Sequence, residues 1–227
     1  MVTGVQTCAL PISGLCTACV DVLAVSGAGI TVMSGGQTGP ICVSDPGVAA
    51  LEDLQFALGE GPCRDAYRDE RPIHEPRLDQ ASQRWPAFAA LADTSGIGAV
   101  FAYPLMAGGA KVGVLTLYQH AGGELTAGQH DDSLAVAEVL TETVLSLQDK
   151  ATSGALAAGL DDAVAYRAEI YQASGMVSLQ LRISVDDALA RIRAHAFAHD
   201  RSVAAVAAEI VSRRLRFTET DEGEIRV

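Results

Sequence analysis

The stretch YRAEIYQASGMVSLQLRISVDDALARIRAHAFAHDRS, residues 166–202, has the apolar rhythm of consecutive helices. A first helix is predicted over about 160–181, because one stripe of it holds Ile170, Ala173, Val177 and Leu181. Its centre carries three small residues in a row, Ala173, Ser174 and Gly175, although glycine inside a helix costs about 1 kcal/mol relative to alanine. Small side chains would allow a neighbouring helix to approach closely. Contact with a binding partner at the helix surface is the other explanation.

Two further helices are predicted in and after this stretch. The second begins at Ser184, where Asp187 three residues later gives a sequence close to a capping box. Its predicted inward face consists of Val185, Ala188, Leu189, Ile192 and Ala196. The third begins near Ser202 and ends in SRRLRF, with Val203, Val206, Ala207 and Ile210 predicted to be buried. We expect an all-α three-helix bundle over residues 161–217, with a core so modest that pairing with a second copy would help it.

The charge of the chain is unevenly distributed. The 227 residues are 49% hydrophobic and 19% charged, which is typical of a globular protein, and the formal net charge is −12. That balance argues against a protein that coats nucleic acid with its whole surface. Residues 163–217 nevertheless carry eight arginines against five acidic residues. Phosphate contact by this arginine-bearing part is therefore a candidate function, while solvated surface arginines are the simpler alternative.

The preceding residues mix β-rich runs with helical patterns. Helices are predicted at Leu15–Val25, after Asp45, before Gly96 and from the N-cap Thr126 onward. Strands are predicted at Gly27–Gly36, Gly39–Asp45, Ala99–Met106 and Lys111–Gln119, with one more inside a long loop over residues 59–76. This order indicates an α+β domain over residues 14–149, with an antiparallel sheet flanked by helices. A linker over 150–160 separates it from the bundle, and an acidic tail over 218–227 ends the chain.

Two parts of the sequence resemble known families. Gly59-Glu60-Gly61-Pro62-Cys63 and Arg84-Trp85-Pro86, followed by GAVFAYPLMAGGAKVGVLTLY, are similar to a GAF sensory domain of the actinobacterial type. The run RAEIYQASGMVSLQLRISVDDALARIRAHAFAHDRSVAAVAAEIV resembles an ANTAR domain, the RNA-binding output module of transcription antitermination regulators. The resemblance covers about residues 14–217 and places the sensor before the output module.

This resemblance implies a dimer that binds tandem RNA stem-loops and so favours an antiterminator over a terminator hairpin. The residues expected to contact RNA are Arg167, Ala173, Ser174, Gly175, Arg182, Arg191 and Arg193. Many ANTAR domains have a lysine between the alanine and the glycine of this motif, where this sequence has Ser174. We expect neither DNA nor a membrane as a partner. A sensor that acts only through protein contacts, with the helical tail as a dimerisation module, is the alternative function.

GAF domains often hold a small molecule between the sheet and the adjoining loop. The candidate pocket residues here are Cys63, Trp85, Phe88, Phe101 and Tyr103, for which core packing is the simpler explanation. The ligand is unknown, because the sequence has neither a CxxCH haem-attachment motif nor a phosphate-binding P-loop. No catalytic constellation such as GxSxG is present, so we expect the protein not to be an enzyme.

The cysteines and histidines carry no strong metal or disulfide pattern. Five cysteines in a chain with a good apolar core do not indicate a disulfide framework, and Cys16 and Cys19 are predicted to be small buried residues. His195 and His199 have metal-binding spacing on a helix, but no third ligand is evident beyond Asp200, so no metal site is expected.

The beginning of the chain is unlike the rest. Gly4–Ser13 reads GVQTCALPIS, which resembles a translated sequencing-adaptor fragment, so residues 1–13 are expected to be non-native or disordered. The first 20 residues lack the basic side chain that precedes the apolar core of a signal peptide, and polar residues interrupt them too often for a membrane span. We therefore expect a cytoplasmic protein.

Overall fold

The computed structural model describes residues 12–34, 37–151, 161–199, 201, 203–219 and 225–226. The chain forms two compact units, Met1–Ser153 and Gly154–Val227, and each is described by itself. The division falls within the segment predicted as a linker, of which residues 152–160 lie outside the described residues.

The first unit is built on a five-stranded antiparallel sheet with the strand order β2-β1-β5-β4-β3. The strands are β1 (Gly27–Ser34), β2 (Gln37–Val43), β3 (Ile73–Glu75), β4 (Ala99–Ala107) and β5 (Ala110–Gln119). The long strands β4 and β5 form a hairpin through Gly108 and Gly109, and β1 joins the other side of β5 with Ile30 opposite Leu115. The predicted antiparallel α+β fold is confirmed.

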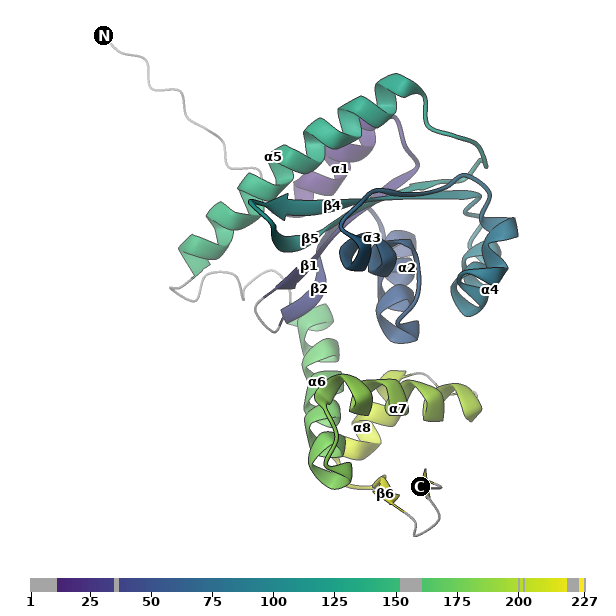
Figure 1. The fold of residues 1–227 in the computed structure, drawn as a ribbon, viewed down its shortest axis with the longest axis vertical. Helices are drawn as coiled ribbons and strands as arrows, with labels where there is room; N and C mark the ends of the chain where they lie inside the picture. The colour runs from purple at the N-terminus through teal and green to yellow at the C-terminus, as the bar shows by residue number, and fades with distance from the viewer. Residues whose placement is uncertain are drawn as a thin grey trace. The chain divides into compact units, whose positions relative to one another are not determined.

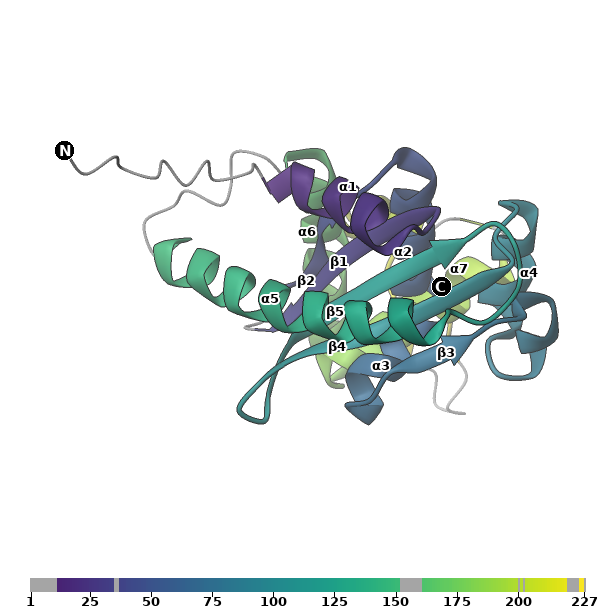
Figure 2. The same cartoon turned by 90° about the horizontal axis from the view of Figure 1, so that it is seen from above.

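Helices cover both faces of this sheet (Figure 1). One face carries α1 (Ile12–Leu23) and α5 (Ala127–Ala151), which Figure 2 shows running side by side over the strands. The other face carries α2 (Pro46–Leu58), α3 (Pro62–Asp69) and α4 (Pro86–Thr94), with a 3-10 helix η1 over Leu78–Gln83. Each face has its own apolar core, so the sheet divides the unit into two separate interiors.

The alternation of side chains along β4 supplies both cores. Phe101, Tyr103 and Leu105 point toward α1 and α5, whereas Val100 and Ala102 point toward the opposite helices. Successive side chains of a strand lie on opposite faces, so this division follows directly from the sequence order. All five side chains are buried, as expected for a strand near the centre of a sheet that is covered on both sides.

Side-chain caps fix the starts of two helices at the predicted positions. The Asp45 carboxylate accepts hydrogen bonds from the backbone N–H groups of Gly47 and Val48 at the start of α2. Thr126 precedes α5, and its hydroxyl accepts a hydrogen bond from the backbone of Gln129, whose side chain in turn accepts one from the backbone of Thr126.

Three details of the first unit differ from the sequence-based prediction. Helix α3 occupies residues predicted as loop, because Pro62 starts it and Cys63 and Ala66 enter the core on one of its faces. The apolar spacing after Thr126 also predicts Leu134 on the inner stripe of α5 with Ala137 and Leu140, but Leu134 is 43% exposed. A three-residue step rotates a helix by less than a full turn, which places Leu134 at the edge of the buried stripe.

Cys16 and Cys42 form a disulfide between α1 and β2. The sequence analysis did not predict this disulfide. The two residues are 26 positions apart in the chain, and their Cα atoms lie 5.9 Å apart only because β2 places Cys42 under α1. Cys19 is buried as predicted, and burial raises the pKa of its thiol. Spacing along the chain could not reveal the pairing, because it depends on the tertiary fold.

The second unit is a helical bundle, with α6 at Asp161–Leu181, α7 at Val185–Ala198 and α8 at Val203–Val211. Its core contains the residues predicted for the three inward faces, with one exception. Val185 is 46% exposed, because it stands directly after the N-cap Ser184, before the helix has turned toward the core. A short strand pair, β6 (Thr218–Glu219) and β7 (Ile225–Arg226), follows α8.

Within the described part of the chain, none of the helices has both the length and the apolar character that crossing a membrane requires.

Candidate functional site

The two sequence motifs that carry the resemblance to a sensory domain meet in space, where they join α3 to α4. Asp65 accepts hydrogen bonds from Arg84 Nε at 2.9 Å and from Trp85 Nε1 at 3.1 Å. Glu60 accepts bonds from the backbone N–H groups of Ala87 and Phe88 at the start of α4, at 2.8 and 2.9 Å. The carboxylate at that position also complements the helix dipole. The hydrogen bonds of Glu60 and Asp65 therefore fix α3 and α4 relative to each other on one face of the sheet.

A buried polar cluster lies between α2 and the sheet, beside these motifs. Glu52 accepts hydrogen bonds from the Thr31 hydroxyl at 2.7 Å and from the Tyr118 hydroxyl at 2.7 Å. Gln55 donates to the Tyr118 hydroxyl at 3.0 Å and accepts from the backbone N–H of Cys63 at 2.8 Å. Burial, with a smaller contribution from the Glu52 charge, raises the pKa of Tyr118 well above its usual value. The cluster thus holds a carboxylate in a nearly water-free interior.

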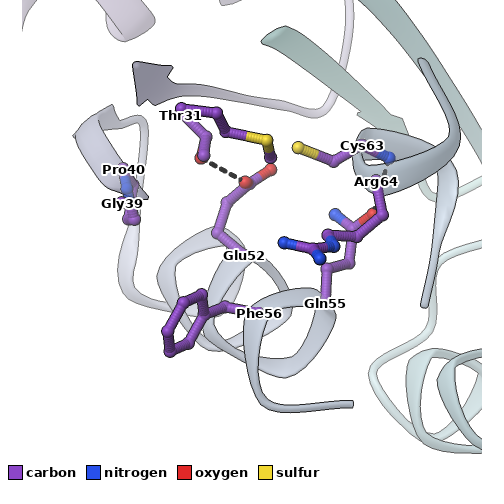
Figure 3. Close-up of a pocket in the computed structure, with 9 residues that line it drawn as sticks. Thr31, Gly39, Pro40, Glu52, Gln55, Phe56, Cys63 and Arg64 are labelled. Atoms are coloured by element: carbon purple, nitrogen blue, oxygen red, sulfur yellow. Dashed lines mark hydrogen bonds between the residues drawn. The ribbon is translucent and has the colours of Figure 1, made fainter. Parts of the chain in front are cut away.

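A small enclosed cavity adjoins this cluster (Figure 3). Its volume of about 10 Å³ is close to the minimum that one water molecule requires. Its lining combines polar, thiol, cationic and apolar groups, namely Thr31, Met33, Gly39, Pro40, Glu52, Gln55, Phe56, Cys63 and Arg64. A ligand larger than a water molecule would enter only after α2, α3 or the β1–β2 hairpin had moved.

Two glycines, Gly29 and Gly61, leave space for the Glu52 and Gln55 side chains because glycine has no Cβ atom. A Cβ atom at Gly29 would lie 2.9 Å from the Glu52 carboxylate. At Gly61, which precedes α3 with φ of +128°, a Cβ would lie 2.5 Å from the Gln55 side chain. The second glycine belongs to the motif GEGPC, so the motif serves the geometry of this cluster as well as the start of α3.

The five residues predicted to line one pocket are divided between the two cores. Cys63 lines the cavity, and Trp85 and Phe88 are buried in the same core. Phe101 and Tyr103 lie across the sheet, among residues packed under α1 and α5. The five residues therefore do not line one pocket, because α3 and α4 cover the face of the sheet opposite to Phe101 and Tyr103.

The sequence analysis did not predict the cluster of Thr31, Glu52, Gln55 and Tyr118. The spacing of Glu52 and Gln55 could have indicated these two residues. Glu52 and Gln55 are three residues apart in α2, so they lie close together on one side of the helix, next to apolar Val48 and Leu51. Polar groups beside such an apolar stripe are expected to be buried only with partners. The partners on β1 and β5 come from residues 21 and 66 positions away and could not be assigned from spacing.

A second group of polar rings lies on the other sheet face, at the start of α5. The Tyr103 hydroxyl is 3.1 Å from His130 Nδ1, and the His74 ring lies 5.0 Å from the His130 ring. Burial lowers the pKa of His74, and the neighbouring His130 lowers it further. Burial raises the pKa of Tyr103 to about 12.

The Tyr103 shift predicts an alkaline pH dependence of stability. Because the folded-state pKa of about 12 exceeds the ordinary value of 10.0, the contribution is complete below pH 10 and is lost as pH rises toward 12. We expect Tyr103→Phe to show a less steep decline in the free energy of unfolding than wild type between pH 10 and 12. Urea unfolding followed by fluorescence of Trp85, the single tryptophan, measures this quantity. Parallel wild-type and variant profiles would contradict the prediction.

In the second unit, the three small residues at the centre of α6 have different surroundings. Ala173 and Ser174 are fully buried in the bundle, and the Ser174 hydroxyl donates to the backbone carbonyl of Ile170 at 2.8 Å. Gly175 is only partly buried, and a Cβ atom added to it would meet no described atom within 4 Å. Close helix packing thus explains the first two residues, whereas the glycine faces open space.

The predicted RNA-contacting arginines lie on two helices. Arg182 is exposed at the end of α6 in a left-handed conformation with φ of +53°, and Arg191 and Arg193 lie half-buried on α7. The side chain of Arg167 lies outside what the structure describes. Because Ala173 and Ser174 are buried, Gly175 is the member of the small-residue run that remains accessible to a partner.

Arginines of the two units differ in their ionic partners. In the first unit Arg68, Arg71, Arg77, Arg84 and Lys111 each form an ion pair with a carboxylate, while Arg64 lines the cavity. In the second unit an ion pair joins Arg201 to Glu209. Between described side chains of this unit, no ion pair involves Arg182, Arg191, Arg213, Arg214 or Arg216. Guanidinium groups of this unit are therefore available to anions.

The chain thus consists of an α+β unit with two apolar cores, followed by an arginine-bearing helical bundle. The chain belongs to the GAF domain family: the family model matches residues 12–144, and a model of the ANTAR domain matches residues 158–211. The protein is thus a signal-responsive regulator of the GAF–ANTAR type. No match was found among curated proteins.

Several solved structures resemble the first unit. The GAF domain of a phosphoenolpyruvate-protein phosphotransferase from Coxiella burnetii is 14% identical, with a TM-score of 0.49 over 63% of this chain and 89% of that one. The type II free methionine-R-sulfoxide reductase of Thermoplasma acidophilum is 11% identical, with a TM-score of 0.45 over 59% and 89%. A GAF domain/HD domain protein from Geobacter sulfurreducens is 10% identical, with a TM-score of 0.47 over 60% and 91%.

Proposed function

We propose that the protein is a cytoplasmic transcription antitermination regulator that binds tandem RNA stem-loops through its ANTAR domain under control of the GAF sensor. It acts as a dimer, so that two bundles engage two hairpins. The resemblance of residues 158–211 to ANTAR domains, which are RNA-binding output modules, supports an RNA partner. The proposal assigns the protein to regulation and not to catalysis.

The observation that carries this proposal is the difference in ion pairing between the two units. A protein of net charge −12 repels RNA over most of its surface, so binding requires a local cationic surface. Sensor arginines are largely neutralised by aspartates, whereas Arg182 and Arg191 have no carboxylate partner among the described residues. The planar fork of a guanidinium matches phosphate oxygens. Because the bundle has few aromatic residues for stacking on bases, its helices are better suited to recognising the shape and the loop bases of a hairpin.

Measuring the affinity for a tandem-hairpin RNA as a function of salt tests the proposal. Replacing both Arg191 and Arg193 with glutamine is expected to weaken binding and to make the plot of log affinity against log salt shallower by about 1.4 to 1.8, since each lost phosphate contact removes about 0.7 to 0.9 from the slope. Glutamine retains part of the arginine stem, which limits the loss of packing for these two half-buried side chains.

The matched control is the double variant Arg71→Gln, Arg77→Gln in the sensor, which changes the net charge equally. Both of these arginines are exposed and paired with an aspartate. Equal effects of the two double variants would mean that net charge alone matters, and no binding by wild type at low salt would overturn the RNA proposal itself.

The buried cluster around Glu52 is the candidate element of the sensor that responds to a signal. Its cavity accepts little more than one water molecule, so a ligand would have to displace α2, α3 or the β1–β2 hairpin. The lining groups, a carboxylate, an amide and the Arg64 guanidinium, suit a small polar molecule. A mass spectrum of small molecules that co-purify with the protein would identify such a ligand.

One observation favours the second candidate function, in which the bundle binds only protein. Leu179 on α6 is 83% exposed, and contact with another protein would remove its apolar side chain from water. A dimer that binds no hairpin RNA at low salt would support this alternative.

A further inference from the structure

The segment Arg213–Phe217, here called the arginine segment, begins two residues after the end of α8 and lies beyond residue 211, where the match to the ANTAR domain ends. Three of its five residues, Arg213, Arg214 and Arg216, are exposed arginines. Nothing in the domain match or in the set of expected RNA contacts accounts for them.

Backbone hydrogen bonds hold the arginine segment against the end of α8. Arg213 adopts the left-handed conformation, with φ of +60°, and its N–H donates to the carbonyl of Ile210 at 2.9 Å. The N–H groups of Arg214 and Leu215 both donate to the carbonyl of Glu209, at 2.8 and 3.1 Å. Bonds of this kind satisfy the last carbonyls of a helix and reverse the direction of the chain.

Phe217 then fixes the other end of the segment to the bundle. Its side chain is 2% exposed, and its ring packs edge-on to that of His195 on α7, with the centroids 5.6 Å apart. Its backbone N–H donates to the Gln180 side chain on α6 at 2.9 Å. The segment is thus held at both ends, and a fixed backbone loses less conformational freedom when a ligand binds.

The side chain of Glu209, whose backbone carbonyl accepts from the segment, is already occupied. Glu209 accepts both forks of Arg201, each at 2.9 Å, and this hydrogen bonding lowers the pKa of Glu209, with a smaller effect from Arg214. No ion pair joins Arg213, Arg214 or Arg216 to a carboxylate among the side chains that the structure describes. Within the described part of the unit, three guanidinium groups on an anchored backbone therefore have donors without a carboxylate partner, and these donors match phosphate oxygens.

We propose that the arginine segment is a second RNA-contacting surface of the C-terminal unit, which binds backbone phosphates of the hairpin through Arg213, Arg214 and Arg216. This inference rests on the proposed RNA-binding function and extends it beyond the ANTAR domain. Because phosphates are present in every RNA, the segment contributes affinity and salt dependence and not sequence preference.

The test compares three triple variants with wild type, using an RNA that carries two short hairpins in tandem. In the first, glutamine replaces Arg213, Arg214 and Arg216, and in the second, lysine replaces them. The third is the matched control, in which glutamine replaces Arg68, Arg71 and Arg77 of the sensor, all of them exposed and ion-paired. Circular dichroism and thermal unfolding establish that each variant is folded.

The glutamine variant of the segment is expected to bind at least about tenfold more weakly near 0.1 M salt and to have a slope shallower by about 2 to 3. The lysine variant retains most of the slope, because it retains the charges. The inference is overturned if wild type binds and the glutamine variant keeps the wild-type slope, or if the sensor control loses as much; the proposed function then still stands. Absence of binding by wild type overturns both.

Discussion

Replacing Glu52 with alanine is expected to lower the free energy of unfolding of the sensor unit by about 3 kcal/mol. The carboxylate is 3% exposed and accepts hydrogen bonds from the hydroxyl groups of Thr31 and Tyr118. Truncation leaves both donors in an interior where each unsatisfied group costs about 1–3 kcal/mol, and it also leaves a cavity where the side chain was. Urea unfolding followed by Trp85 fluorescence measures the loss, because Trp85 is buried in the same core.

Glutamine at position 52 provides the matched control. It retains the size of the side chain and one carbonyl acceptor for Tyr118, and its amide can donate to Thr31, whose hydroxyl also accepts. We expect a loss of about 1 kcal/mol for Glu52→Gln. Equal losses for the alanine and glutamine variants would mean that the hydrogen bonds contribute little, and would contradict the account of the cluster.

The cost of burying Glu52 bears on what the sensor does. A carboxyl group in an apolar core is expensive unless it is paired, and the hydroxyl groups of Thr31 and Tyr118 are two of the partners of Glu52. An apolar residue could fill the space more cheaply. A buried carboxyl group that lines a cavity makes this cluster a candidate for ligand recognition.

Local periodicity predicted the bundle well because each helix there has a single buried face. The stripe Ile170, Ala173, Val177 and Leu181 and the Ser184 capping box are present as predicted. These features depend on the 3.6-residue repeat and on one hydrogen bond between neighbours in sequence, so they can be read without knowing the tertiary fold.

The candidate pocket could not be predicted in the same way, because it depends on which face of the sheet each helix covers. Alternation along β4 placed Phe101 and Tyr103 together, but nothing local assigned α3 and α4 to the opposite face. The Cys16–Cys42 disulfide and the Glu52–Tyr118 hydrogen bond likewise join residues far apart in the chain. Such contacts follow from strand order, which the sequence pattern left undetermined.

The run Ala173-Ser174-Gly175 shows the limit of treating neighbouring residues as one site. Consecutive helix positions differ by about 100°, so three in a row cannot share a face. Ala173 and Ser174 are buried, whereas Gly175 is only partly buried and faces open space. A larger side chain at Gly175 is therefore expected to change stability and RNA binding in opposite directions.

Gly175→Leu is expected to stabilise the C-terminal unit by up to about 1 kcal/mol and yet to weaken binding of tandem-hairpin RNA at least tenfold. Stability rises because leucine has a far better helix propensity than glycine and no described atom lies within 4 Å of the new Cβ. Binding falls if the RNA approaches the helix at the glycine, since the added side chain then occupies the space that the RNA requires. Thermal unfolding and filter binding measure the two quantities.

The control is Ala190→Leu, which adds a similar volume at an exposed position on α7. It is expected to leave RNA affinity unchanged within about twofold. If Gly175→Leu binds RNA as tightly as wild type, the glycine face of α6 is not the approach surface. Loss of the dimer in the Gly175 variant, measured by sedimentation, would instead identify this face as a protein contact. Glycine in this helix interior costs about 1 kcal/mol and no described atom lies within 4 Å of its Cβ position, so these two variants test whether a partner approaches the backbone there.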